Sequence, residues 1–168
     1  MDKPIIVASV IVVLIIIYMI IKKYRTNKKI IKELEKVCIE FNYKLEKGDK
    51  ICDYIITTNN KKIKLVICEI PKNSSVTINS RLTWCLRWGG KRVGRSYPNQ
   101  RYMNELTSFL KLNKEEGVLK VIALYPQTEK IQKYLNESEI AVVNRGELVY
   151  DYKVINFSEI DQGFDDLV

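Results

Sequence analysis

An uncharged, apolar stretch near the N-terminus constrains this chain more than any other feature. Residues 4–21 form a run of 18 residues made almost wholly of Ile, Val, Leu, Ala and Met. As a helix at ~1.5 Å per residue the run is about 27 Å long, close to the ~30 Å hydrocarbon core of a bilayer. The sequence therefore predicts a transmembrane anchor with a basic flank over residues 1–26.

Positive charge follows this run and is nearly absent before it. Lys22, Lys23 and Arg25 come directly after the apolar residues, whereas only Asp2 and Lys3 precede them. A cleavable signal peptide has its basic stretch in front of the apolar one. Because basic residues mark the cytoplasmic side of membrane helices, we expect a single-pass protein with its N-terminus outside and its C-terminal domain in the cytoplasm. The basic flank then lies beside anionic lipid.

Net charge and reactive side chains limit the functions open to the chain. With 28 Lys and Arg against 20 Asp and Glu, the net charge of +8 favours anionic partners, which are nucleic acid, lipid head groups or both. The absence of histidine excludes Ser-His-Asp and Cys-His catalysis and histidine-based zinc sites. The four cysteines lack Cys-x-x-Cys spacing, which favours buried free thiols.

The remaining periodicity predicts one cytoplasmic α/β domain over residues 27–158, followed by an acidic tail at 159–168. Apolar spacing of three and four residues indicates helices, and short runs of Ile, Val and Leu indicate strands. The expected helices are 27–45, 99–112 and 128–136, and the expected strands are 51–57, 62–70, 118–125, 141–143 and 148–154. This order predicts a mixed β-sheet flanked by helices.

Two carboxylates fall on neighbouring strands of the expected hairpin. Asp53 lies early in the first strand and Glu69 at the end of the second. Mg²⁺ or Mn²⁺ takes oxygen ligands and needs only one or two protein carboxylates besides a substrate phosphate. The pair is therefore a candidate metal site for phosphodiester cleavage. The alternative is that Glu69 reaches solvent or pairs with a nearby lysine.

The pattern around these carboxylates resembles the restriction-endonuclease-like, or PD-(D/E)xK, nuclease superfamily. The shared features are an N-terminal helix, an Asp in one strand, a Glu after the apolar run Leu65-Val66-Ile67-Cys68, and then a helix and a further strand. The start of the second helix, Gln100-x-Tyr102, is similar to the Gln- and Tyr-bearing helix of nuclease-related domains. The resemblance implies a restriction-endonuclease-like core in which Asp53 and Glu69 are the metal ligands.

The lysine that the superfamily carries two residues after the Glu is replaced here by Pro71. Lys72 follows one position late, and reaches the site only if Pro71 creates a bulge. With such a bulge the catalytic residues are Asp53, Glu69 and Lys72. Otherwise Lys64 or a cation of the following basic segment must substitute, or the fold has lost its activity.

That basic segment, residues 73–104, contains no acidic residue. Its candidate nucleic-acid-binding residues are Arg87, Lys91, Arg92, Arg95, Gln100 and Tyr102. Arginine and lysine attract phosphates, and exposed aromatic rings stack on unpaired bases. The alternative is a strand over residues 84–88, in which Trp84, Leu86 and Trp88 face the core and Arg87 faces out.

Together these features predict a membrane-anchored protein that binds DNA or RNA and cleaves it as a metal-dependent phosphodiesterase. The alternative function is a catalytically inactive scaffold with a nuclease fold, which binds anionic lipid or a protein partner. The two functions differ in one structural respect. Cleavage requires Asp53, Glu69 and a cationic nitrogen to lie close together.

Overall fold

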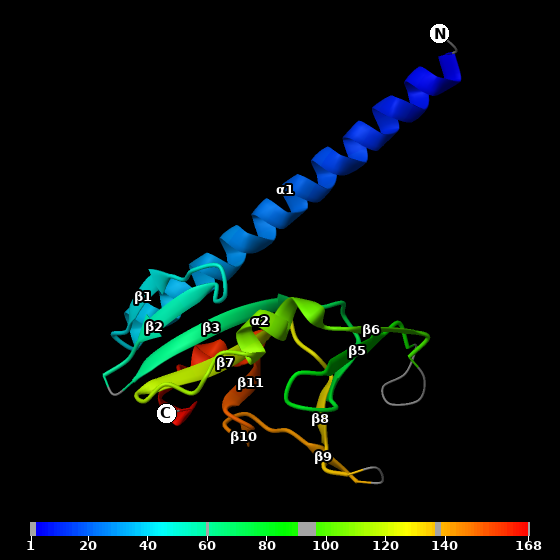
Figure 1. Ribbon diagram of the computed structural model, residues 1–168. Coiled ribbons are helices and arrows are strands. Elements are labelled where there is room, and N and C mark those ends of the chain that lie inside the picture. The colour runs from blue at the N-terminus through cyan, green and yellow to red at the C-terminus, as the bar shows by residue number, and fades with distance from the viewer. Residues whose placement is uncertain (1–2, 60, 91–96, 137–138, 168) are drawn as a thin grey trace. The chain divides into compact units, whose positions relative to one another are not determined.

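The structure is a computed structural model that describes residues 3–59, 61–90, 97–136 and 139–167 (Figure 1). The chain divides into two units, the first ending at Lys36 and the second beginning at Val37. The described residues of the first unit belong to one helix, α1 (Lys3–Glu40), and residues 37–40 of this helix are counted in the second unit. α1 is continuous through residues 26 and 27, so it joins the segment predicted as an anchor (1–26) to the helix predicted from residue 27.

No helix within the described residues is long and apolar enough to cross a membrane. The finding contradicts the predicted transmembrane anchor over residues 1–26. The predicted single-pass orientation, with an outer N-terminus and a cytoplasmic domain, depended on that anchor and is corrected with it.

The second unit contains two mixed sheets, which confirms an α/β class. Sheet A has six strands in the order β1-β2-β3-β7-β11-β10, in which β3, β7 and β11 run parallel and the other pairs are antiparallel. Its strands are β1 (Lys44–Lys47), β2 (Tyr54–Thr57), β3 (Lys62–Glu69), β7 (Val118–Tyr125), β10 (Leu148–Val149) and β11 (Tyr152–Asn156). The hairpin of β2 and β3 was predicted from its β-branched residues.

Sheet B has five strands in the order β6-β5-β4-β8-β9, with β4 parallel to β8. Its strands are β4 (Ser74–Ile78), β5 (Trp84–Trp88), β6 (Asn99–Tyr102), β8 (Lys130–Tyr134) and β9 (Ile140–Val142). The helical elements of the second unit are η1 (Asn104–Leu106), α2 (Thr107–Leu110), η2 (Phe157–Gln162) and η3 (Asp165–Leu167). Sheet B and α2 follow β3 and precede β11 in the chain.

Apolar side chains from both sheets meet in one buried cluster. Val76 and Leu86 of sheet B, Ile122 and Leu124 of sheet A, and Phe109 of α2 belong to it and are almost fully buried. Because side chains alternate between the two faces of a strand, sheet B turns its second face away from this core.

Two of the predicted helices are strands in the structure. Residues 99–102 pair with β5, and residues 130–134 pair with both β4 and β9. Only Thr107–Leu110 of the predicted helix over 99–112 is α-helical. The alternative interpretation of residues 84–88 as a strand with Trp84 in the core is confirmed.

Residues 159–167, the described part of the acidic segment predicted at 159–168, are folded. Its apolar side chains Phe164 and Leu167 are at most 1% exposed. Arg145 holds this segment through its guanidinium, which donates to both carboxylate oxygens of Asp166 and to the carbonyls of Glu159 and Gly163. The distances are 2.6–2.9 Å.

We expect the Arg145→Ala substitution to lower the free energy of unfolding by about 3 kcal/mol, since it leaves two carbonyls and a carboxylate without their charged donor. Urea unfolding followed by circular dichroism measures this change. Lys44→Ala is the control, because Lys44 forms only a solvent-exposed ion pair with Glu46. An Arg145→Ala midpoint equal to that of Lys44→Ala would show that the segment is held by other contacts.

Candidate functional site

A cavity of about 210 Å³ lies beside the facing ends of β2 and β3. The loop before β2 contributes Asp49, Cys52 and Asp53, β3 contributes Cys68, and η1 contributes Glu105. The lining also includes Lys50, Ile51, Val66, Ile67 and Leu106. It is the part of the structure where the sequence predicted a catalytic site.

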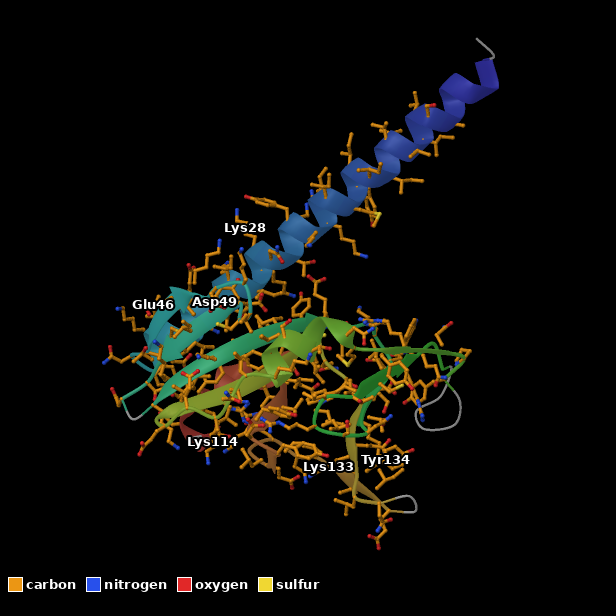
Figure 2. All side chains as sticks on the ribbon, viewed as in Figure 1. Lys28, Glu46, Asp49, Lys114, Lys133 and Tyr134 are labelled. Carbon is orange, nitrogen blue, oxygen red and sulfur yellow. The ribbon has the colours of Figure 1, made fainter. Side chains whose placement is uncertain are left out.

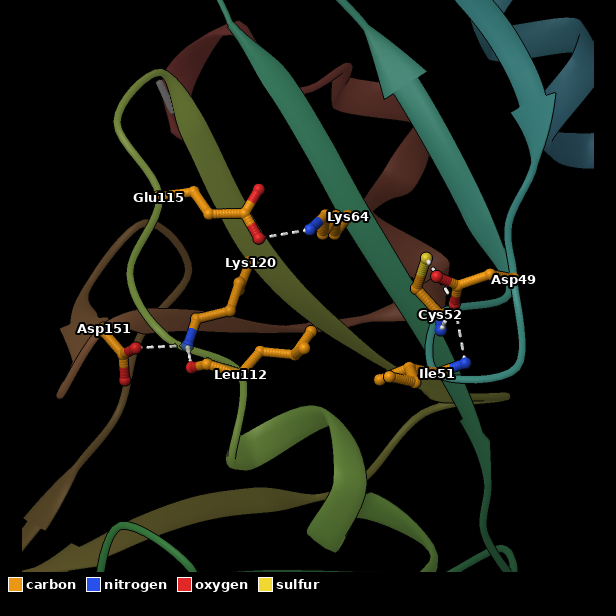
Figure 3. Close-up of polar contacts among 8 residues, drawn as sticks. All are labelled: Asp49, Ile51, Cys52, Lys64, Leu112, Glu115, Lys120 and Asp151. Atoms are coloured by element: carbon orange, nitrogen blue, oxygen red, sulfur yellow. Dashed lines mark hydrogen bonds and ion pairs between the residues drawn. The ribbon is translucent and has the colours of Figure 1, made fainter.

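Asp49 shapes the loop that forms one wall of this cavity (Figure 3). Its Oδ1 accepts hydrogen bonds from the N–H groups of Ile51 at 2.7 Å and Cys52 at 3.0 Å. These bonds hold the pKa of the Asp49 carboxyl below its ordinary value. Gly48 is required before it, since a Cβ there would lie 2.1 Å from the Cys52 carbonyl oxygen. The carboxylate of Asp49 therefore organises the loop.

Asp53 uses its carboxylate to extend the strand ladder. Its backbone N–H donates to the Leu65 carbonyl, and its Oδ2 accepts the N–H of Ile67 at 2.7 Å. The side chain thus takes the place of a backbone carbonyl beyond the end of β2. This structural role occupies one of the two carboxylate oxygens of Asp53, the residue that was predicted to bind the metal.

Asp53 and Glu69 lie on opposite faces of sheet A, which corrects the prediction that they share a metal. Tyr54 is directly opposite Leu65, so the residue before it shares the face of Val66 and Cys68. Glu69 follows Leu65 by an even number of residues and lies on the other face, where it is exposed. Glu69 does not line the cavity.

Lys72 also lies outside the cavity. It is exposed in the turn between β3 and β4, after Ile70 has continued the ladder through its N–H bond to the Tyr125 carbonyl. The cavity lining does not include Lys72. The expected bulge that would carry Lys72 back to the site is therefore not formed.

Glu105 and Cys68 were not identified from the sequence, and they meet inside the cavity. The Cys68 thiol donates to Glu105 Oε1 at 3.5 Å, and Arg101 donates to both oxygens of Glu105 at 2.7 and 2.8 Å. Partial burial on its own would raise the pKa of the Glu105 carboxyl, but the hydrogen bonds that the carboxylate accepts and the charge of Arg101 together outweigh it, and the pKa falls. Burial, and then the Glu105 carboxylate, raise the pKa of the Cys68 thiol to about 12.

Two lysines lie on the same face of sheet A as Cys68, and both have acidic partners (Figure 3). Lys64 donates to Glu115 at 2.5 Å, and the buried Lys120 donates to Asp151 and, at 2.7 Å, to the Leu112 carbonyl. Lys64 alternates with Val66 and Cys68, a spacing that the sequence already contained. Its acidic partner is 51 residues away, which no local pattern could have indicated.

The residues of this cavity do not fit the divalent cation that the nuclease superfamily employs. Mg²⁺ or Mn²⁺ needs carboxylate oxygens that converge on one point. Here Glu105 is bound by Arg101, Asp53 by a backbone N–H, and Glu69 lies on the other face. Among the described residues there is no group of three or more Cys, Asp or Glu that could hold a metal.

The predicted nucleic-acid-binding residues lie on sheet B. Arg87 of β5 is directly opposite Gln100 of β6, and Tyr102 follows on the same face. Arg87 is half-buried, whereas Gln100 and Tyr102 are exposed. The other three predicted residues, Lys91, Arg92 and Arg95, lie outside the described residues.

No family model, no curated protein and no solved structure matches this chain.

Cysteine chemistry at the cavity is testable by alkylation. At pH 8 a thiol with a pKa of about 12 is only ~10⁻⁴ thiolate, so we expect iodoacetamide to modify Cys68 at least 100-fold more slowly in the folded chain than in urea. Peptide mass spectrometry after timed quenching measures both rates. An exposed thiol introduced as Ser108→Cys is the positive control. Equal rates for Cys68 in the two states would show a reactive thiol.

The structural role of Asp53 predicts different effects of two substitutions. Asp53→Ala removes the acceptor of the Ile67 N–H and should lower the free energy of unfolding by about 1 kcal/mol, whereas Asp53→Asn keeps an acceptor and should leave it nearly unchanged. Urea unfolding measures both effects. Mg²⁺ should not raise the melting temperature of the unsubstituted chain. A rise that Asp53→Asn abolishes would instead identify Asp53 as a metal ligand.

Proposed function

We propose that this chain binds nucleic acid and that its nuclease-like sheet does not cleave the ligand. The order of elements supports the resemblance to the restriction-endonuclease-like superfamily. The end of α1 leads into the antiparallel strands β1, β2 and β3, and β7 then pairs in parallel with β3. The short helix α2 lies in the connection between β3 and β7, where the superfamily has a helix. Sheet B adds strands to this connection.

The main argument against cleavage is the set of residues that β3 places on the same face as Asp53. Cleavage in the superfamily uses a carboxylate and a lysine two residues apart on this strand. Here the residues on that face from Asp53 toward the end of β3 are Val66 and Cys68, with Ile70 following, and none of these three is charged at neutral pH. The nearest cations of the face, Lys64 and Lys120, are neutralised by Glu115 and Asp151.

Nucleic-acid binding is supported by cations and aromatic rings outside that cavity. Arg87, Gln100 and Tyr102 share one face of sheet B, and the Tyr102 residue is 59% exposed. Arginine attracts phosphate, the Gln amide can bond to base edges, and the ring can stack on a base. Residues 22–36 of α1 add seven Lys and Arg against two Glu, so attraction of phosphate to this helix is also expected.

We expect the purified full-length chain to bind a fluorescein-labelled 20-nucleotide RNA or DNA at low salt, measured by fluorescence anisotropy. Three phosphate contacts on a single strand would lower the affinity about tenfold or more between 50 and 200 mM salt. A non-ionic detergent is included, because the exposed apolar residues of α1 favour self-association.

In the same samples, denaturing gels should show intact oligonucleotides after long incubation with Mg²⁺ or Mn²⁺. Absence of binding at 20 mM salt would contradict the proposed function and favour a scaffold with another partner. Cleavage that Asp53→Asn or Glu69→Gln removes would contradict the non-catalytic part of the proposal. Cleavage that both substitutions leave unchanged would indicate a contaminating nuclease, which a second purification step removes before the gels are repeated.

A further inference from the structure

Sheet B has two faces of opposite character. The residues Val76, Ile78, Trp84 and Leu86 lie on the face that packs into the core. On the other face, cross-strand neighbours from four strands form two rows. The first row contains Gln100, Arg87, Ser75 and Lys130. The second row contains Tyr102, Cys85, Thr77 and Gln132. We call these two rows the polar face of sheet B.

The polar face carries positive charge and no carboxylate. Arg87 and Lys130 lie on either side of Ser75, two strands apart, which is about 10 Å. Among the described residues neither cation forms an ion pair, in contrast to Lys64 and Lys120 of sheet A. The buried Arg87 Nε has no hydrogen-bond partner in the described part of the chain. A buried donor without a partner is costly, and a turn of the half-buried Arg87 side chain toward an anionic ligand would relieve that cost.

Aromatic rings lie at two positions of the same surface. Tyr102 is exposed on β6, which forms one edge of the sheet. Tyr134 follows Gln132 by two residues on β8 and so shares its face (Figure 2). Between them lie the short side chains Ser75 and Thr77 of the central strand β4, which are only 2% and 3% exposed, so a ligand on this face contacts the longer side chains around them. Proteins that bind single strands with little sequence preference stack bases on aromatic rings that lie beside cations.

We infer that the polar face of sheet B binds a single-stranded nucleic acid, with phosphates at Arg87 and Lys130 and an unpaired base stacked on Tyr102. This inference rests on the proposed function and narrows its ligand class. In a duplex the base faces are stacked on one another, so Tyr102 gains contact only with an unpaired strand. The amides of Gln100 and Gln132 lie in the same rows and reach base edges of an unpaired strand.

The test compares a 12-nucleotide single strand with the duplex of the same sequence on the full-length chain, by anisotropy at 50 mM salt. We expect the single strand to bind at least tenfold more tightly. Tyr102→Leu should lower the single-strand affinity about tenfold and leave duplex affinity unchanged. Tyr18→Leu is the matched control, because Tyr18 of α1 is similarly exposed, at 65%, and lies outside the basic residues 22–36.

A second pair of variants tests the phosphate contact. Lys130→Gln should reduce the slope of log affinity against log salt by about 0.7, the value of one phosphate contact on a single strand. Lys114→Gln, at another exposed lysine, should leave that slope unchanged (Figure 2). Circular dichroism melting verifies that each variant is folded.

The outcomes separate this inference from the proposed function. If no nucleic acid binds at 20 mM salt, both are wrong. If duplex and single strand bind equally and Tyr102→Leu changes neither affinity, the proposed function stands and the inference is wrong. If poly-glutamate displaces the single strand as efficiently as unlabelled oligonucleotide does, the face recognises charge alone, and the inference is also wrong.

Discussion

The parallel pairing of β3 with β7 is the constraint on which the second unit depends. The two strands align over eight residues, from Lys62 opposite Val118 to Glu69 opposite Tyr125. Parallel neighbours require a long crossover, because the chain must return to the end at which it started. Here the crossover spans residues 70–117 and contains β4, β5, β6, η1 and α2. Strands β4, β5 and β6 of sheet B therefore lie in the connection between two strands of sheet A. The other two strands of sheet B, β8 and β9, follow β7 in the chain.

Local sequence patterns predicted the strands of sheet A better than the outer strands of sheet B. Strands β3 and β7 are rich in Ile, Val and Leu on both faces, interrupted by Lys64 and Lys120, and these apolar runs indicate buried strands. Residues 130–134 have no such signal. The sequence Lys-Ile-Gln-Lys-Tyr is compatible with a helix or a strand, and its pairing with β4, 55 residues earlier, decides the outcome. Five residues cannot establish a period when a distant partner provides the hydrogen bonds.

The candidate site failed as a prediction because strand register is not visible in a single strand. Alternation determines which residues of one strand share a face, but which face of β2 meets which face of β3 depends on their pairing. A shift of one residue moves every side chain to the other face. The observed register aligns Tyr54 with Leu65 and separates Asp53 from Glu69. The same register brings Asp53 to the face of Lys64, which was predicted only as a substitute for the missing catalytic lysine.

The two sheets differ in whether their cations are already neutralised, and this difference bears on function more than the total charge does. On sheet A, the ion pairs of Lys64 and Lys120 leave little attraction for an incoming phosphate. On sheet B, Arg87 and Lys130 share a face with polar and aromatic side chains and no carboxylate. Coulomb attraction acts on the charge that remains after local pairing. Under the proposed function, a polyanion is therefore drawn to sheet B rather than to sheet A, and the parallel pair β3 and β7 of sheet A holds the crossover strands in register.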